Sequence, residues 1–130
     1  MAYEGPQIKI PGLVAGGDLS AKQYHYVKMS ADNTVVICAA LTDVPVGVLQ
    51  NAPAQGQAAE VCAIGVTKIV GDADLDAGAA IGTSADGQAD ARTIGTDTTH
   101  YVNGIVILGN GGAGGMITAV INCASPSRAA

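Results

Sequence analysis

The residue types most often used in catalysis are scarce in this chain and lie far apart in sequence. There are two histidines, His25 and His100, and two glutamates, Glu4 and Glu60. A serine hydrolase of the α/β type holds its nucleophile in a G-x-S-x-G turn, and no serine of this chain has that setting. We therefore find no catalytic constellation in the sequence and expect that the protein is not an enzyme.

The three cysteines, Cys38, Cys62 and Cys123, are odd in number and widely spaced, and no C-x-x-C pair occurs. Cys38 and Cys62 stand inside apolar runs, where a thiol is generally inert. We interpret all three as free, buried thiols of a protein made in a reducing cytoplasm.

Three alternating aspartates, Asp72, Asp74 and Asp76, resemble the first ligands of a calcium-binding loop. Such a loop needs glycine at its sixth position and glutamate at its twelfth, and these positions hold Ala77 and Thr83. We therefore interpret the segment as a polar turn, and we expect neither a metal nor another cofactor.

A glycine-rich stretch, ILGNGGAGGMITAVI, occupies residues 107–121. A dinucleotide site needs a helix after the glycines, because the pyrophosphate rests on the helix N-terminus. A phosphate-binding loop of the Walker type needs lysine and then serine or threonine. Met116 and Ile117 follow the last glycine and begin a β-branched, alternating run, so the stretch predicts a plain β-hairpin.

Composition favours strands and a thin core. Of 130 residues, four are tyrosine, 18 are glycine and none is phenylalanine or tryptophan, while valine and isoleucine greatly outnumber leucine. β-branched residues fit a pleated sheet, but without large aromatic side chains each buried position contributes little. We infer that partner subunits supply further burial.

The charge and hydropathy patterns exclude two classes of partner. A net charge of −5 without a basic cluster argues against nucleic-acid binding. No apolar run reaches the length of a membrane span, so we expect no membrane partner.

Short apolar runs separated by turn signals predict an all-β barrel or sandwich. The expected strands cover residues 24–29, 35–40, 42–50, 59–70, 80–83, 89–92, 101–108 and 116–123. Gly65 indicates a bulge or bend, and Asp86-Gly87 indicates a hairpin turn. Segment 72–81, the one helix candidate, is expected to form no more than a turn or a single helical turn.

Two further patterns stand out within these strands. The segments that begin at Gly47 and Gly104 echo each other: glycine, apolar residues, a turn cluster and a second strand. Two similar hairpins or chance both account for the echo. Tyr24 and Tyr26 should share one strand face, half-buried with their hydroxyl groups in water; stacking on a base or sugar is the alternative.

Residues 42–91 and the closing hairpin resemble the small decoration, or cement, proteins of tailed-phage heads. That family shows an apolar-G-V strand, a turn ending in glycine, a V-x-x-x-G-V strand, an A-G-A step and a D-G turn. The matching residues here are Val46-Gly47-Val48, Gly56, Val61 with Gly65-Val66, Ala77-Gly78-Ala79 and Asp86-Gly87, and the closing pattern runs from Gly104 to Ile121. The resemblance covers about residues 24 to 122.

This resemblance implies a compact β-barrel or β-tulip domain, which we place at residues 21–124, between an extended N-terminal arm, 1–20, and a frayed tail, 125–130. It also implies a structural virion protein on the outer surface of a phage head. Such proteins form homotrimers at three-fold and quasi-three-fold positions and clamp neighbouring major capsid protein subunits, without catalysis or cofactor.

The arm is the expected capsid-binding element, because an extended segment can add a strand to an exposed sheet edge. Its prolines disfavour helix. The candidate contact residues are Tyr3, Pro6, Ile8, Ile10, Pro11 and Leu13. Deletion of residues 2–14 is expected to leave a folded domain that no longer attaches to capsids.

The alternative function is a small β-barrel module that binds a ligand or glycan. A carrier domain would need a modifiable lysine at a hairpin tip, and Lys22, Lys28 and Lys68 stand elsewhere. A glycan-binding barrel would need exposed aromatic side chains, for which only the four tyrosines are available.

Overall fold

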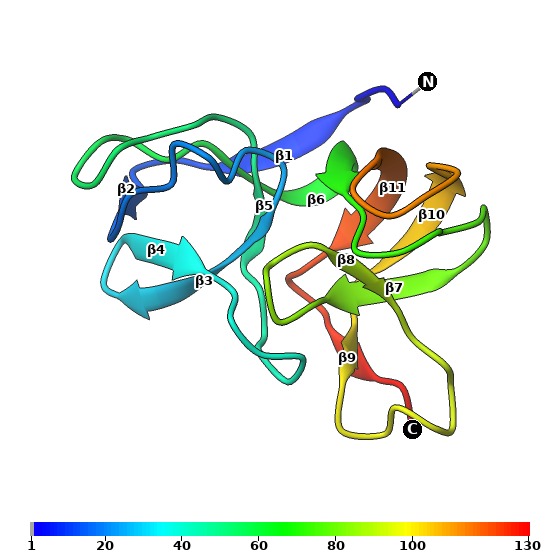
Figure 1. Ribbon diagram of the computed structural model, residues 1–130. Coiled ribbons are helices and arrows are strands. Elements are labelled where there is room, and N and C mark those ends of the chain that lie inside the picture. Colours follow the sequence, from blue (N-terminus) through cyan, green and yellow to red (C-terminus); the bar gives the residue numbers. More distant parts are fainter. Residues whose placement is uncertain (1) are drawn as a thin grey trace.

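A computed structural model describes residues 2–130 and shows an all-β protein, with no helix in that part of the chain (Figure 1). The strands are β1 (Gln7–Ile10), β2 (Val14–Ala15), β3 (Tyr26–Ala31), β4 (Thr34–Ile37), β5 (Gly47–Leu49), β6 (Val61–Val70), β7 (Ala80–Thr83), β8 (Ala89–Ala91), β9 (Tyr101–Val102), β10 (Gly104–Leu108), β11 (Met116–Asn122) and β12 (Ser127–Arg128). The predicted all-β class is confirmed, and segment 72–81 forms bends and a turn.

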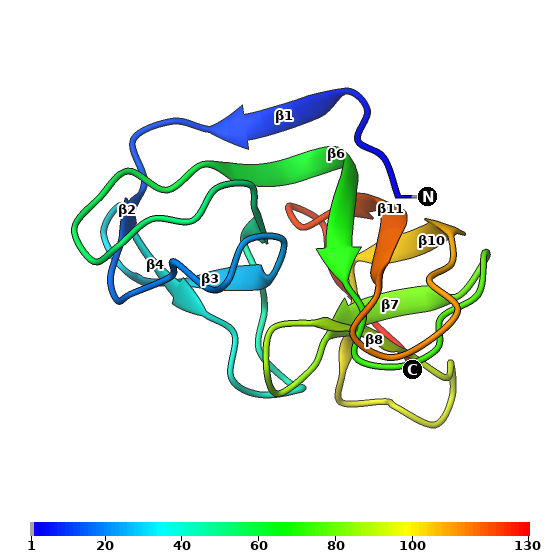
Figure 2. The ribbon, with the colours of Figure 1, turned by 45° about the horizontal axis from the view of Figure 1, so that its top comes forward.

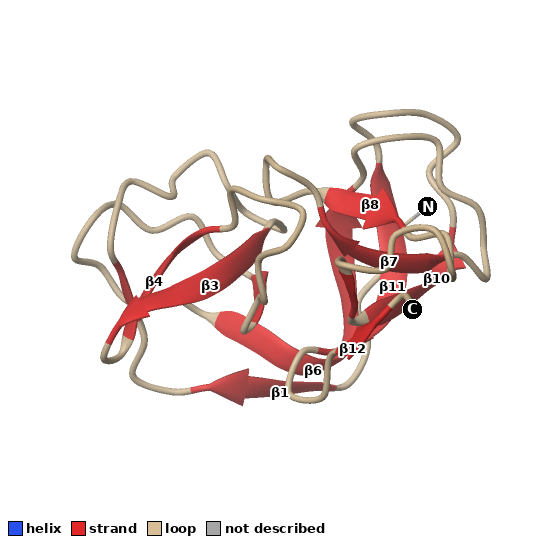
Figure 3. Cartoon of the chain, turned by 90° about the horizontal axis from the view of Figure 1, so that it is seen from below, coloured by secondary structure: helices blue, strands red, loops and turns tan. Residues whose placement is uncertain are grey.

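Ten strands form one sheet, in the order β2-β4-β3-β5-β6-β11-β10-β7-β8, with β1 paired to β6 beside this path. Strands β12 and β9 form a second, two-stranded sheet. The end strands β2 and β8 do not pair with each other, so the strands form no single closed barrel of the expected kind. Isolated bridges Val14–Ala58 and Gly71–Ala89 bring each end of the sheet back beside an end of β6. Strands β1 to β5 and β7 to β12 form two lobes that β6 connects (Figures 1 and 3).

The bend in β6 explains the two lobes. Its first half pairs with β1 and β5, and its second half pairs with β11. Between them Gly65 has φ of 139°, and a Cβ there would collide with the carbonyl oxygen of Pro6. The register with β1 also shifts in this region. The predicted irregularity at Gly65 is confirmed, and Figure 2 shows β6 turning sharply between the lobes.

Two hydrophobic clusters form the core. The first surrounds Ile69, Ile81, Ile117 and Ile121, lies mainly between β6, β7, β10 and β11, and extends into the other lobe through residues such as Tyr26 on β3. The other holds Val27, Val35, Leu49 and Val61 with three residues from the N-terminal segment, Leu13, Ala15 and Leu19. The core is built mainly of aliphatic side chains, as the composition predicts, but it is divided in two.

The repeated hairpin is present in both lobes. The strand order β4-β3-β5-β6 has the same connectivity as β8-β7-β10-β11. Gly47 and Gly104 each open the third strand of a set, and a Cβ at either position would press on the following strand. The sequence echo therefore corresponds to two similar hairpins, and the glycine-rich stretch is the loop of the second one.

The loop before β5 differs from the strand expected over 42–50. The Asp43 carboxylate accepts hydrogen bonds from the Ala39 and Ala40 amides and from Lys28 Nζ, at 2.8 to 3.0 Å. These bonds hold a tight turn, so the strand starts only at Gly47, and Val44 remains 46% exposed.

The tyrosine prediction is also wrong. Tyr24 has φ of 64° and lies before β3, so it does not share a strand face with Tyr26. Tyr26 is completely buried, and its hydroxyl group has no hydrogen-bond partner within residues 2–130. The chain has no phenylalanine, and this tyrosine fills a position at which phenylalanine would suffice.

Both ends of the chain are attached to the domain. The tail expected to fray forms β12, which pairs with β9, and Ala129 is fully buried. At the other end β1 pairs with β6, and β2 pairs in parallel with β4. The arm is thus extended, as expected, but it lies on its own sheet.

Candidate interaction surface

Hydrogen bonds fix the start of the arm to the Thr118 side chain on β11 and to the backbone of β6. The amide of Tyr3 donates to Thr118 Oγ1 on β11 at 2.7 Å, and the Thr118 hydroxyl donates to the Tyr3 carbonyl at 3.0 Å. Two residues later the Gly5 amide donates to the Val66 carbonyl on β6, at 3.0 Å. The arm therefore lies across the junction of the lobes before it becomes β1.

The structure brings four of the six predicted contact residues to the surface. Tyr3 and Ile8 are 48% and 62% exposed, and Pro6 and Pro11 are also exposed. Ile10 is half-buried against the second cluster, and Leu13 is only 4% exposed. Leu13 is therefore a core residue in this structure, and a deletion of 2–14 would remove part of the core.

Two open hollows flank the arm. One, of about 250 Å³, is lined by Pro6, Gln7, Ile8, Ile64 and Gly65. The other, of about 330 Å³, lies between the arm and residues 51–60, and Lys9 and Glu60 form an exposed ion pair on its rim. The first hollow is lined mainly by apolar groups, whereas the second also has polar and charged lining residues.

A third apolar surface lies on the β10–β11 hairpin, far from the arm in sequence. Ile105, Ile107, Met116 and Val120 are each 39% to 43% exposed. Ile105 and Val120 are directly opposite each other across the two strands. We call these four residues the hairpin face. The alternation of apolar residues in 101–108 and 116–123 predicted strands, but it could not tell which face would remain uncovered.

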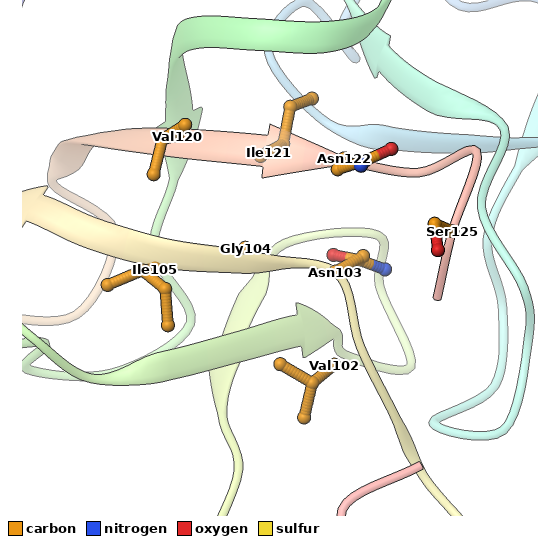
Figure 4. Close-up of a pocket in the computed structure, with 8 residues that line it drawn as sticks. All are labelled: Val102, Asn103, Gly104, Ile105, Val120, Ile121, Asn122 and Ser125. Atoms are coloured by element: carbon orange, nitrogen blue, oxygen red, sulfur yellow. The ribbon is translucent and has the colours of Figure 1, made fainter. Parts of the chain in front are cut away.

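A hollow of about 220 Å³ adjoins the hairpin face (Figure 4). Its lining residues are Val102, Asn103, Gly104, Ile105, Val120, Ile121, Asn122 and Ser125. Asn103 lies between β9 and β10, within the expected strand 101–108. Its amide donates to the Ile81 carbonyl, and its carbonyl accepts from the Asn122 amide. No sequence pattern singles out Asn103, because a single asparagine between strands also suits an ordinary turn.

The three cysteines and His25 are buried, and burial shifts the pKa of each of them. Burial raises the pKa of Cys38 and Cys123 to about 12 and that of Cys62 to about 11, so the thiols stay protonated at neutral pH. His25 is buried, with Nδ1 at 3.1 Å from the Gln23 carbonyl, and burial lowers its pKa. His100 lies 3.8 Å from Asp97 at its nearest ring nitrogen.

The acidic segment and the glycine loop hold each other in place. The Asn110 side chain accepts from the Leu75 amide and donates to the carbonyls of Ala73 and Gly115, all at 3.0 Å. Within residues 2–130, no three acidic, histidine or cysteine side chains gather closely enough to hold a metal ion. The loop also contains no helix N-terminus that could receive a phosphate.

Three of the four tyrosines are unsuited to stacking on a sugar. Tyr26 is buried, Tyr24 lies under the Lys68 ammonium group at 5.5 Å, and Tyr101 lies under the Arg128 guanidinium group at 5.6 Å. Tyr3 alone among them is largely exposed. In residues 2–130 no helix is long and apolar enough to span a membrane.

Comparison with solved structures shows a shared fold. The chain superimposes on the head fiber gp8.5 N base of bacteriophage phi29 with a TM-score of 0.64 and 18% sequence identity. The match covers 91% of this chain and 96% of that chain. No protein-family model matches the sequence. No curated protein matches it either.

Proposed function

We propose that this protein is a structural component of a phage head. In this proposal it is a decoration, or cement, protein that binds the outer surface of the shell and stabilises contacts between major capsid protein subunits. It acts without catalysis or cofactor, as a homotrimer at three-fold and quasi-three-fold positions.

The observation that carries the proposal is the fold shared with a head fiber base over nearly the whole of both chains. Two features of the molecule agree with a binding role. Apolar side chains are exposed on the arm and on the hairpin face, and such patches mark interaction surfaces. The thiols are buried and protonated, so they are poor nucleophiles.

The direct test is binding to heads. Purified protein is mixed with phage heads that lack it, the heads are pelleted, and the pelleted particles are imaged by electron cryomicroscopy. We expect saturable binding, ordered knobs on the outer surface, and heads that withstand a higher temperature than undecorated heads. Absence of binding by the intact chain at micromolar concentration would refute the proposal.

The fold shared with a head fiber base favours a second candidate function, the base of a head fibre. The same images separate the two candidates. A decoration protein occupies many lattice positions as compact knobs, whereas a fibre base lies at the foot of a longer projection.

A further inference from the structure

Thr118 interrupts the alternation of buried and exposed side chains along β11. The strand pairs with β6 in an unbroken register, so alternate residues share a face. One face packs into the core, and its residues are at most 1% exposed: Ile117, Ala119 and Ile121. On the outer face Met116 and Val120 are 40% and 42% exposed, but Thr118 between them is completely buried. Another part of the molecule therefore covers Thr118.

The cover is the start of the N-terminal arm, residues 2–5, which we call the strap. The Tyr3 amide donates to Thr118 Oγ1 at 2.7 Å, and the Thr118 hydroxyl donates to the Tyr3 carbonyl at 3.0 Å. One hydroxyl group thus makes the two hydrogen bonds with Tyr3 that a neighbouring strand would make through its backbone. Gly5 lies against Val66, since a Cβ at Gly5 would be only 3.0 Å from the Val66 Cβ. Figure 2 shows the chain leaving the line of β1 and running toward β11 at its N-terminal end.

The strap is held mainly by hydrogen bonds and contributes little to the core. Tyr3 is 48% exposed and Glu4 is also exposed. None of the four strap residues, all of which the structure describes, belongs to a hydrophobic cluster. Segments with few buried apolar contacts open locally at a free energy well below that of global unfolding. Ile10 packs against the second cluster and Leu13 lies within it, so the strap can open while the rest of the arm stays attached.

The strap lies at one end of a row of apolar side chains that crosses three strands. Val120 is opposite Val66 on β6 and opposite Ile105 on β10. Val120 and Ile105 belong to the hairpin face, whereas Val66 is half-buried and lies against Gly5 of the strap. With the strap in place the exposed part of this row ends at Val120, and without the strap it continues to Val66.

We infer that residues 2–5 are a reversible strap, that the Thr118 hydroxyl group is its latch, and that release of the strap extends the hairpin face onto β6. A ligand that needs the extended surface binds only the open form, so its apparent affinity is proportional to the fraction of molecules that are open. The inference goes beyond the proposed function and does not depend on it, because the isolated protein suffices for every measurement that tests it.

Amide hydrogen exchange followed by NMR tests the strap in the wild type. We expect the Tyr3 and Gly5 amides to exchange at least about tenfold faster than the slowest amides of β6, because local opening exposes them without global unfolding. If both amides exchange as slowly as those of β6, the strap does not open separately and the inference is overturned.

Substitutions at Thr118 test the latch. Thr118→Val keeps the shape of the side chain but removes the hydroxyl group, so the Tyr3 amide should exchange about tenfold faster than in the wild type. Thr118→Ser retains a hydroxyl group and should leave the exchange rate close to that of the wild type. Thr83→Val is the matched control, since it removes another buried threonine hydroxyl, one that donates to the Ser84 carbonyl. Equal exchange of the Tyr3 amide in Thr118→Val and Thr118→Ser would refute the latch.

Dye binding measures the surface that the strap covers. Nile red is an uncharged dye whose emission rises on exposed apolar surface, as that of other hydrophobic probes does. Deletion of residues 2–5 keeps Leu13, and we expect it to raise the emission about twofold or more over the wild type, with a rise also in Thr118→Val. Val66→Ser in the shortened protein should remove the gain, whereas Ile94→Ser, at another exposed isoleucine, should retain it.

The outcomes decide separately. If the deletion gives no gain in emission, the strap covers no apolar surface and the inference fails. A gain that Val66→Ser does not reduce would place the uncovered surface elsewhere and overturn the extension onto β6. Should Thr118→Val not fold, the wild-type exchange rates and the deletion decide, since neither involves a substitution at Thr118.

Discussion

Individual buried polar groups affect the free energy of unfolding of this protein, and Tyr26 is the clearest case. Its ring fills the first cluster, but its hydroxyl group is buried without a hydrogen-bond partner in residues 2–130. Because a buried unpaired hydroxyl costs free energy, Tyr26→Phe should raise the free energy of unfolding by about 1 kcal/mol. Urea denaturation measures the change. Tyr101→Phe, at a half-buried tyrosine, is the control and should change stability by less than about 0.5 kcal/mol. A destabilised Tyr26→Phe would mean that the hydroxyl group has a partner in solution.

His25 makes a second prediction at this scale, on pH. Burial lowers its pKa below the ordinary 6.5, so the unfolded chain binds a proton more readily than the folded one. The stability due to neutral His25 is complete above pH 6.5 and declines as the pH falls through 6.5 toward the folded-state pKa. The slope for one proton cannot exceed about 1.4 kcal/mol per pH unit.

The measurement is the free energy of unfolding between pH 7 and pH 5. His25→Gln should flatten this part of the curve, whereas His100→Gln, at the other histidine, should leave the decline in place. An unchanged decline in His25→Gln would show that another group is responsible.

Among the elements, the arm combines a core segment with a surface segment. Leu13 is 4% exposed and its carbonyl accepts from the Ala59 amide at 2.9 Å, whereas Ile8 on β1 is 62% exposed. Leu13→Ala should therefore lower the free energy of unfolding by about 2–5 kcal/mol, as cavity-forming changes do. Ile8→Ala should change it by no more than about 0.5 kcal/mol.

The difference in burial between Leu13 and Ile8 also determines how much of the arm can be deleted without unfolding the domain. Deletion of residues 2–10 should leave a folded domain by circular dichroism and thermal melting, and deletion of 2–14 should lower the melting temperature strongly. Equal melting temperatures of the two deletions would show that the second cluster does not depend on Leu13.

The elements also show what the sequence could and could not predict. Strands, the Asp86-Gly87 turn, the irregularity at Gly65 and the glycine hairpin were predicted because each depends on neighbouring residues. The division into two lobes was not predicted, because it depends on β5 and β11 pairing with successive halves of the bent strand β6. The pairing of β9 with β12 likewise gives no local signal, although β9 lies within the expected strand 101–108. Asn103 was also missed, because whether its side chain finds hydrogen-bond partners depends on the tertiary packing around it and not on its neighbours in sequence.

At the scale of the whole molecule, two small aliphatic clusters share one strand, and few large side chains fill them. Such a chain gains stability when a partner binds its folded form, by an amount that grows with partner concentration. In the proposed function this partner is the capsid shell, which repeats the same site over its surface. A thin core is therefore compatible with a durable particle, provided that attachment buries the exposed apolar surfaces.

The nature of those surfaces leads to a last prediction, on ionic strength. The hollow has no charged lining residue, and the four residues of the hairpin face are all apolar. Attachment through them should depend on apolar burial, which salt does not screen. We expect affinity for heads to change less than about threefold between 50 and 500 mM NaCl, whereas attachment through several ion pairs would weaken by orders of magnitude. Pelleting at both salt concentrations measures the ratio, with Lys9→Gln as a control for the exposed ion pair beside the arm. Suppose instead that the wild type loses more than tenfold in affinity at the higher salt concentration and that Lys9→Gln shows no such salt dependence. This result would show that the protein attaches through the Lys9–Glu60 ion pair beside the arm and not through the hairpin face.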